Sequence, residues 1–345
     1  MNRRAERLRP SLDEPLLVLD RANVRYLTGF DSSNAALLVG PDELTLFADF
    51  RYAAAGRAVA GVTFVETRRA LLSDLAGRLS GRIGFEPDSV PYAGYETLAA
   101  GAAELIPRRG LVEALRAVKD EEEIAAIRRA SEVTTAAFEK LAAEPFIGRS
   151  ERDLAWRMET LLHELGGQGV AFDIGIGAGP NGAVPHAHPA ERTVERGDLV
   201  VVDAGARIDG YNSDCTRTFA AAPISPELAA VYDVCAEAQR AGLDAVRPGV
   251  AGIDADRAAR DVVEAAGFGD HFGHGLGHGV GLLVHEAPRL STESTDVLAA
   301  GNVTSVEPGI YLEGRGGVRI EDLVVVRDDG AEVLTAFTKE LVTVG

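Results

Sequence analysis

The sequence of 345 residues predicts a mixed α/β (α+β) protein with two domains, a small one over residues 1–117 and a larger one over residues 118–345. Three observations support this prediction. Short strand-like and helix-like segments alternate up to about residue 116, a long capped helix follows, and one 14-residue pattern occurs twice in the second part. The length also favours two domains, because a single hydrophobic core rarely grows this large.

The strand-like runs of the first domain are short and rich in aliphatic or β-branched residues: "LLVLD", "AALLVG", "LTLFAD", "TFVET" and "RIGFE". Stretches with apolar residues near helical spacing lie between several of them, such as "RRALLSDLAGRLS". This alternation indicates a small α/β domain.

Two capped helices are expected to open the second domain. The first covers residues 118–143, where Asp120 can cap a first turn rich in acidic residues. The second begins at Ser150, with Asp153 three residues later, and ends at Gly166-Gly167. We expect the domain boundary just before the first of these helices.

The composition is that of an ordinary soluble globular protein, with 46% apolar and 26% charged residues. A net charge of −18 argues against binding to a nucleic acid backbone. Cys215 and Cys235 are the only cysteines, too few for a disulfide framework, which favours a reducing compartment. No apolar run is long enough for a secretory signal or a membrane span, so we expect a cytoplasmic protein without membrane or nucleic acid partners.

The second domain contains an internal repeat. Residues 197–210, "GDLVVVDAGARIDG", align without a gap with residues 301–314, "GNVTSVEPGIYLEG", with four identities. The alignment superposes Asp203 on Glu307. We interpret it as a duplicated half-domain in which each half donates one carboxylate.

Each copy of the repeat continues into a hairpin that carries a second carboxylate. The first hairpin is expected to turn at Ile208-Asp209, which places Asp203 opposite Asp214. The second is expected to turn around Gly314 in "EGRGG", which places Glu307 opposite Glu321. Opposed residues have Cβ atoms roughly 4.5–5.5 Å apart, so like charges there repel unless a cation lies between them. The alternative, two solvated edge strands, fits less well with the Val/Ile/Leu-rich surroundings.

Histidines are concentrated in one glycine-rich segment, residues 271–286, "HFGHGLGHGVGLLVHE", which holds four of the seven. Four carboxylates and one histidine form a ligand set for two divalent metal ions that share oxygen ligands. The abundance of oxygen favours Mn²⁺, with Co²⁺, Fe²⁺ and Zn²⁺ as alternatives.

These motifs resemble those of the "pita-bread" metallopeptidases, which include methionine aminopeptidase, aminopeptidase P and prolidase. "HGLGHGVGLLVHE" resembles the proline-peptidase signature, and "VEPGIYL" and "RIEDLVVV" match the surroundings of the two glutamates. "NVRYLTGF" and the rest of the first domain resemble the creatinase-type N-terminal domain. The resemblance implies a pseudo-twofold catalytic domain, and the family's five metal ligands match, in order, Asp203, Asp214, His278, Glu307 and Glu321.

Carried over to this chain, the resemblance implies that Asp203 binds one metal ion and that Asp214 and Glu321 bridge both. His278 and Glu307 would complete the second site, and Glu307 would also transfer protons.

The remaining functional residues are also implied by the resemblance. His186, His274 and His285 match substrate-handling histidines of the family, and Arg319 matches an arginine that supports the site. Arg289 is a candidate reader of the substrate carboxylate. Two histidines have no clear counterpart and are interpreted as structural: His188 and His271.

The function implied is hydrolysis of the Xaa-Pro peptide bond by a hydroxide activated by two metal ions, in a homodimer. Xaa-Pro dipeptidase (prolidase) is favoured, because the segment between Glu286 and Glu307 is short and Arg289 could bind a free carboxylate. Xaa-Pro aminopeptidase (aminopeptidase P) acting on longer peptides is the main alternative. A non-catalytic peptide-binding protein and a creatinase are disfavoured by the complete ligand set, and methionine aminopeptidase by the N-terminal domain.

Overall fold

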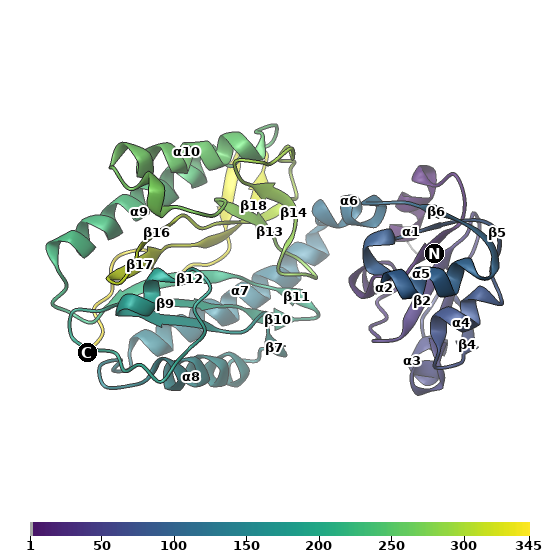
Figure 1. Ribbon diagram of the computed structural model, residues 1–345, viewed down its shortest axis with the longest axis horizontal. Coiled ribbons are helices and arrows are strands. Elements are labelled where there is room, and N and C mark those ends of the chain that lie inside the picture. Colours follow the sequence, from purple (N-terminus) through teal and green to yellow (C-terminus); the bar gives the residue numbers. More distant parts are fainter. Residues whose placement is uncertain (1–2) are drawn as a thin grey trace. The chain divides into compact units, whose positions relative to one another are not determined.

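The structure, a computed structural model, describes residues 3–345 and divides into two compact units, Met1–Arg116 and Ala117–Gly345 (Figure 1). The division lies one residue before the boundary that we expected. Within the described residues, no helix is both long and apolar enough to cross a membrane.

The first unit is a six-stranded mixed sheet with helices. Its strands, in spatial order, are β4 (Thr63–Thr67), β3 (Leu44–Asp49), β2 (Ala35–Val39), β1 (Leu16–Val18), β5 (Ser80–Phe85) and β6 (Ala102–Pro107). Its helices are α1 (Arg3–Leu8), α2 (Arg21–Thr28), α3 (Ala53–Arg57), α4 (Leu71–Ala76), α5 (Tyr92–Ala99) and α6 (Leu111–Ala117), with single 3₁₀ turns at η1 (Arg9–Ser11), η2 (Phe50–Tyr52) and η3 (Pro87–Ser89). All five strand-like runs of the sequence form strands; β6 was not expected, because alanine and glutamate are poor strand formers.

The second unit opens with two long helices, α7 (Glu121–Ala142) and α8 (Glu151–Glu164). Both expected capping residues are confirmed: Asp120 and Ser150 each accept a hydrogen bond from the backbone N–H three residues later, within complete capping boxes. The caps satisfy N–H groups that the first turn of a helix leaves unpaired. The helix α8 therefore begins where the sequence indicates, and α7 begins directly after its predicted cap, three residues later than the expected range of 118–143.

The first half of this unit packs its strands on α7 and α8. Its strands are β7 (Gly169–Val170), β8 (Gly175–Ala178), β9 (Leu199–Ala204), β10 (Ala206–Ile208), β11 (Tyr211–Asn212) and β12 (Cys215–Ala220), with the 3₁₀ turn η4 (Gly179–Ala183). Four aromatic rings fill the core between helices and strands, with neighbouring ring centroids 5.2–6.4 Å apart: Phe138, Phe146, Phe219 and Phe337. Burying such rings makes this core a main source of stability in the half.

The second half repeats the arrangement with its own helix pair, α9 (Pro226–Ala245) and α10 (Gly252–Ala265), as Figure 1 shows. Its other elements are η5 (Gly269–His271), β13 (Gly277–Gly279), β14 (Glu286–Leu290), β15 (Val303–Val306), β16 (Gly309–Leu312), β17 (Gly316–Arg319), β18 (Asp322–Arg327) and β19 (Gly330–Val333). The repeated 14-residue pattern therefore contains β9 and β10 in one half and β15 and β16 in the other.

The register of the first hairpin differs from the prediction. Its turn is centred on Asp209-Gly210, because Ile208 pairs with Tyr211, and Thr216 rather than Asp214 lies opposite Asp203. The shift amounts to two residues, and side chains alternate with a period of two, so Asp214 stays on the face of Asp203.

The register of the second hairpin is confirmed. Gly309 pairs with Arg319 and Val306 with Asp322, which places Glu307 opposite Glu321.

A close backbone contact beside the first hairpin generates a stability prediction. A Cβ atom at Gly205 would lie 2.0 Å from the carbonyl oxygen of Ser213 and 3.0 Å from Cβ of Ala171. Gly205→Ala should lower the free energy of unfolding by about 1–3 kcal/mol, the usual range for overpacking. Urea unfolding measures this loss. Gly273→Ala is the matched control, because a Cβ there meets nothing within 4 Å; equal midpoints for the two variants would contradict the prediction.

Candidate metal centre and substrate pocket

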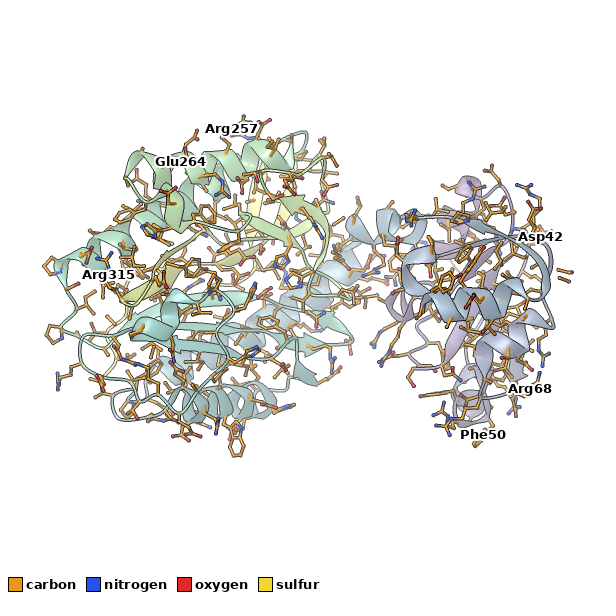
Figure 2. All side chains as sticks on the ribbon, viewed as in Figure 1. Asp42, Phe50, Arg68, Arg257, Glu264 and Arg315 are labelled. Atoms are coloured by element: carbon orange, nitrogen blue, oxygen red, sulfur yellow. The ribbon has the colours of Figure 1, made fainter. Side chains whose placement is uncertain are left out.

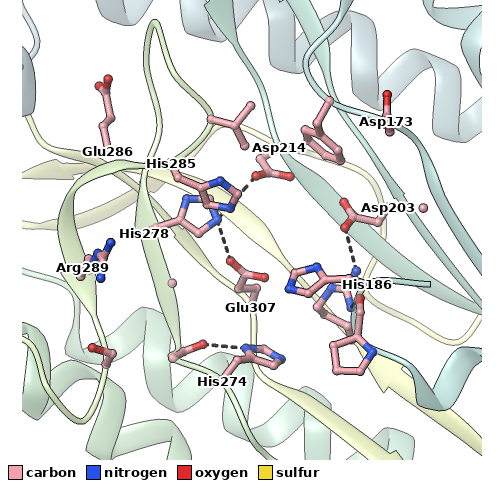
Figure 3. A pocket seen from close by; sticks show the side chains of 18 of the residues that line it. Asp173, His186, Asp203, Asp214, His274, His278, His285, Glu286, Arg289 and Glu307 are labelled. Atoms are coloured by element: carbon pink, nitrogen blue, oxygen red, sulfur yellow. Dashed lines mark hydrogen bonds and ion pairs between the residues drawn. The ribbon is translucent and has the colours of Figure 1, made fainter. Parts of the chain in front are cut away.

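A pocket of about 730 Å³ opens between the two halves of the second unit (Figure 3). Its lining includes most residues that the sequence singled out: His186, Asp203, Asp214, His274, His278, His285, Arg289, Glu307 and Arg319. Glu321 lies behind this surface and is almost fully buried. His188, for which we expected no function, also lines the pocket, whereas His271 is absent from the lining and its Nδ1 lies 3.2 Å from the carbonyl oxygen of Tyr311.

Three carboxylates meet at the floor of the pocket. Oxygen atoms of Asp203, Asp214 and Glu321 lie within 4.8 Å of one another. In the described part of the chain, Oδ1 of Asp203 and Oε1 of Glu321 are buried without a hydrogen-bond partner. Burial and mutual repulsion raise the pKa values of Asp214 and Glu321 well above their ordinary values, and burial also raises the pKa of Asp203. Unpaired oxygen donors and uncompensated negative charge fit one or more divalent cations.

His278 and Glu307 form a directly bonded pair beside this cluster. Nε2 of His278 lies 3.0 Å from Oε1 of Glu307 and 3.8 Å from Oδ2 of Asp214. Burial opposes charge on both partners, but their mutual hydrogen bond prevails and raises the pKa of His278 to about 9 and lowers that of Glu307 to about 2. The pair is therefore an imidazolium and a carboxylate, and a metal ion bound there would replace the imidazolium proton.

Arg319 compensates part of the negative charge. Its Nη2 donates to Oδ2 of Asp203 at 2.7 Å, its Nη1 to the hydroxyl oxygen of Tyr311 at 2.9 Å, and its Nε to Oγ1 of Thr216 at 3.1 Å. Thr216 in turn donates to Oε2 of Glu321 at 2.8 Å. The guanidinium group therefore fixes the orientation of two carboxylates, one directly and one through Thr216.

Tyr311 and Thr216 are site residues that the sequence analysis missed. Thr216 could have been found from a correct hairpin register, since it lies opposite Asp203. Tyr311 sits in "VEPGIYL" four residues after Glu307, and only the tertiary structure shows its hydroxyl between Arg319 and Nε2 of His274, at 2.9 Å from each.

The three remaining pocket histidines differ in their surroundings. Nδ1 of His274 lies 2.8 Å from the carbonyl oxygen of Gly275, so both its ring nitrogens are engaged, and burial lowers its pKa. The ring of His285 lies over that of His278, with centroids 4.3 Å apart, and burial together with the charge of His278 lowers its pKa. Among the described residues, neither His285 nor His186 has a hydrogen-bond partner for its ring, so both are available to a substrate.

A buried ion pair supports the segment that carries His285. Nζ of Lys119 lies 2.8 Å from Oε1 of Glu286, and the two side chains are 1% and 8% exposed. Gly281 leaves room for this pair, because a Cβ there would come within 2.2 Å of Oε1 of Glu286. A buried pair of this kind holds its two segments together, since separating the charges would leave each one buried alone.

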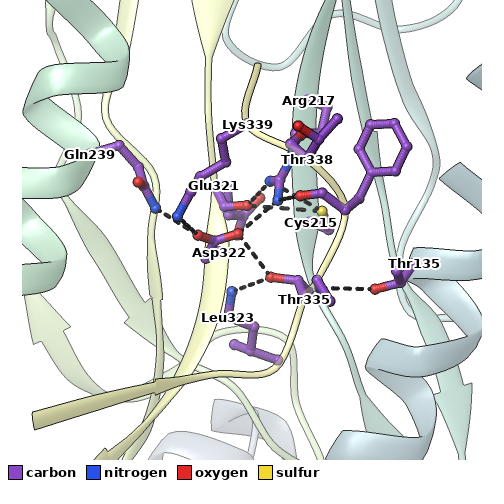
Figure 4. Close-up of polar contacts among 12 residues, drawn as sticks. Thr135, Cys215, Arg217, Gln239, Glu321, Asp322, Leu323, Thr335, Thr338 and Lys339 are labelled. Carbon is purple, nitrogen blue, oxygen red and sulfur yellow. Dashed lines mark hydrogen bonds and ion pairs between the residues drawn. The ribbon is translucent and has the colours of Figure 1, made fainter. Parts of the chain in front are cut away.

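A second polar network lies behind Glu321 (Figure 4). The fully buried Arg217 donates to the carbonyl oxygen of Glu321 and, through Nη2, to Oδ1 of Asp322 at 2.7 Å. Gln239 and Lys339 donate to the other oxygen of Asp322 at 2.9 Å and 2.6 Å. The backbone at Glu321 is thus held from behind by groups from β12, α9 and the C-terminal segment.

Comparisons with known proteins agree with this geometry. Residues 125–328 match Metallopeptidase family M24, and residues 6–118 match the Creatinase/Prolidase N-terminal domain. The chain is 37% identical over 334 residues to an uncharacterized peptidase of Bacillus subtilis (strain 168), covering 95% of each chain.

Two solved structures share the whole fold. The Xaa-Pro dipeptidase from Bacillus anthracis superposes with a TM-score of 0.94 at 36% identity over 99% of each chain. The X-Pro aminopeptidase from Thermotoga maritima superposes with a TM-score of 0.89 at 33% identity over 99% of this chain and 100% of the other. The acidic cluster is consistent with a family whose members use divalent metal ions. The chain belongs to Metallopeptidase family M24, with a creatinase/prolidase-type N-terminal domain.

Proposed function

We propose that this metallopeptidase hydrolyses Xaa-Pro dipeptides. The observation that carries the proposal is the placement of the cationic Arg289 in the same pocket as the acidic cluster. Among the described residues, its guanidinium group has no ion-pair partner, so it is available to a substrate carboxylate. The similarity to an Xaa-Pro dipeptidase over nearly the whole chain supports the same assignment.

We propose that Asp203, Asp214, Glu321, His278 and Glu307 hold two divalent cations, with Asp214 and Glu321 shared between them. The 4.8 Å cluster and the adjacent His278–Glu307 pair support this ligand set, and its oxygen-rich character favours Mn²⁺ over Co²⁺, Fe²⁺ or Zn²⁺. When bound, such cations would activate water at neutral pH and polarise the scissile carbonyl group.

The residues of the chain would then orient the substrate and move protons. Glu307, kept ionised by its neighbours, can accept a proton from the attacking water and deliver it to the leaving proline nitrogen. His186 and His285, whose rings have no partner in the described structure, can donate hydrogen bonds to the substrate. His274 would have to exchange its bond to Tyr311 for one to the substrate, while Arg319 keeps Asp203 in place.

A proline nitrogen in peptide linkage carries no N–H group. A site that requires no donor from the scissile nitrogen and has room for the ring therefore selects for proline, because other peptides would leave their N–H unpaired. Hydrolysis of an Xaa-Pro dipeptide frees proline, whose carboxylate Arg289 would have bound from the start.

A second candidate function is Xaa-Pro aminopeptidase activity on longer peptides, favoured by the similarity to the Thermotoga maritima X-Pro aminopeptidase. Initial rates on Ala-Pro, Ala-Pro-Ala and Met-Ala-Ala with Mn²⁺ separate the possibilities. We expect Ala-Pro to be cleaved with the highest kcat/KM. A preference for Ala-Pro-Ala would support the second function, and cleavage of none of the three would overturn both.

The homodimer and the cytoplasmic location expected from the sequence remain predictions. Both cysteines are free and buried, which is compatible with a reducing compartment. Sedimentation velocity measures the oligomeric state, and a monomer at assay concentration would contradict the first prediction.

The metal site predicts a stability effect that can be measured without substrate. Folding raises the pKa values of the Asp214 and Glu321 carboxyl groups. Their protonated forms therefore stabilise the folded state at a pH below the pKa values of the unfolded chain, and this stabilisation is lost as the pH rises through the pKa values of the folded protein. Mn²⁺ should therefore raise the Tm more at pH 8 than at pH 5.5. At a hundredfold excess over Kd, one bound ion stabilises the folded state by about 2.7 kcal/mol. Chelation should abolish hydrolysis.

Asp214→Asn tests the same site by removing a carboxylate charge instead of adding a cation. It removes one repelling charge, so the metal-free variant should unfold at a higher temperature than the metal-free wild type at pH 8, with a smaller increment from Mn²⁺. Asp42→Asn, on the first unit, is a control of equal charge change (Figure 2). An undiminished Mn²⁺ increment in Asp214→Asn would contradict the role of Asp214 as a ligand.

Arg289 predicts a substrate-dependent kinetic effect. Arg289→Ala should raise KM for Ala-Pro roughly ten- to a hundredfold, the equivalent of losing a charge-assisted hydrogen bond of about 1.5–3 kcal/mol. KM for Ala-Pro-Ala should change much less, because its carboxylate lies one residue farther on. Arg315→Ala is the matched control, since Arg315 is exposed and pairs with Glu227. An equal rise in KM for both substrates would show that Arg289 does not bind the carboxylate of the dipeptide.

His285 predicts a loss of rate without a loss of metal. His285→Ala should retain metal ions, because the ring lies over His278 without joining the carboxylate cluster. Loss of a donor to a developing oxyanion typically lowers kcat on the order of 10²–10³-fold. Metal analysis beside kcat checks this, and a parallel fall in metal content would reassign His285 as a ligand.

A further inference from the structure

A local bulge interrupts the strand pairing at the wall of the pocket. Val170 pairs with Ala206, and Gly175 pairs with Asp203. The four residues 171–174 therefore lie opposite only two, residues 204–205, and the chain has to loop outward. Bulges of this kind redirect side chains and are common next to active sites. Phe172 and Asp173, the middle residues of the bulge, both line the pocket.

Asp173 differs from the other acidic residues of the pocket. Six carboxylates line it: Asp173, Asp203, Asp214, Glu286, Asp296 and Glu307. Four of the six have a hydrogen-bond or ion-pair partner within 3.0 Å: Asp203 with Arg319, Glu286 with Lys119, Asp296 with the backbone N–H of Arg289, and Glu307 with His278. Asp214 belongs to the acidic cluster with Asp203 and Glu321. In residues 3–345, Asp173 alone of the six has neither a hydrogen bond nor a cation for its carboxylate.

Asp173 lies two residues from a backbone position that pairs with the acidic cluster, since Gly175 pairs with Asp203. Gly175, between Asp173 and the paired strand, carries no side chain, and a Cβ there would lie 3.3 Å from Cβ of Asp203. Figure 3 shows Asp173 on the side of Asp203, whereas Arg289 lies on the opposite side, beyond His278 and His285. An unpaired acid and an unpaired cation thus lie on opposite sides of the same cluster, an arrangement complementary to a molecule with an amine at one end and a carboxylate at the other.

We propose that Asp173 binds the α-ammonium group of the substrate and thereby selects peptides with a free N-terminus. This inference rests on the proposed peptidase function and adds a specificity-determining residue to it. An exposed aspartate on a surface loop is usually only solvated. Here the bulge directs the residue into a pocket in which the remaining acids are already engaged, and a bound peptide would exclude water from the resulting ion pair.

The test compares two substrates that differ only in the amine. Ala-Pro and propionyl-proline share the scissile amide, the proline ring and the carboxylate. With Mn²⁺ present, the wild type should prefer Ala-Pro. Asp173→Asn should lower kcat/KM for Ala-Pro about tenfold, mainly through KM, since a partly exposed ion pair is worth less than a buried one. It should leave kcat/KM for propionyl-proline unchanged.

Two further variants make the test specific. Asp173→Glu keeps the charge on a longer side chain and should restore at least part of the preference for the amine. Asp42→Asn makes the same chemical change on the exposed surface of the first unit and should alter neither substrate. If Asp173→Asn lowered kcat/KM equally for both substrates, or changed kcat/KM for neither, the proposal would be overturned.

Failure of the proposed function gives a different result. If the wild type cleaves neither compound with Mn²⁺, the peptidase assignment fails. Calorimetric titration of the wild type and of Asp173→Asn with Ala-Pro and propionyl-proline then still measures whether Asp173 binds the amine. Weaker binding of Ala-Pro by Asp173→Asn, with propionyl-proline bound equally by both proteins, would support ammonium recognition. Equal affinities of the wild type and Asp173→Asn for Ala-Pro would overturn it.

Discussion

Repulsion among Asp203, Asp214 and Glu321 is the interaction on which the second unit depends. The three carboxylates share a small volume beneath the pocket, bordered by apolar strands of both halves. Charges so placed cost free energy unless cations or hydrogen bonds compensate them. The surrounding structure can be understood as a set of compensating groups arranged by distance from this cluster.

The nearest compensation comes from fixed cationic and hydroxyl groups. Arg319 contacts Asp203 directly and reaches Glu321 through Thr216, which holds both acids in one orientation. Behind Glu321, Arg217 donates a hydrogen bond to the backbone carbonyl oxygen of Glu321 and forms an ion pair with Asp322. Each of these contacts joins residues more than 100 positions apart, so the site also holds the two halves together. Rigid ligands favour metal binding, because less orientational freedom is lost on binding.

The pocket above the cluster is less completely paired. Four polar side chains line the cavity without partners from the described chain: His186, His285, Arg289 and Asp173. Lys119 and Glu286, in contrast, neutralise each other. A protein interior normally satisfies its polar groups, and unsatisfied ones gather where a ligand completes them. The groups that Arg319, Thr216 and Arg217 hold at the floor therefore maintain the site, and the unpaired groups of the wall are those that we propose to recognise a substrate.

Local patterns in the sequence determined much of this protein. Short runs of aliphatic and β-branched residues predicted five of the six strands of the first unit. Capping residues at Asp120 and Ser150 predicted two helix starts, and the repeated pattern singled out Asp203 and Glu307. These features depend on interactions between residues close in the chain, which the sequence displays directly. The tertiary structure decided what depends on distant segments: the two-residue shift of the first hairpin, the contacts of Tyr311 and the Lys119–Glu286 pair. It also decided the bulge that turns Asp173 into the pocket, because the register of two strands is settled by the packing of whole faces rather than by either strand alone.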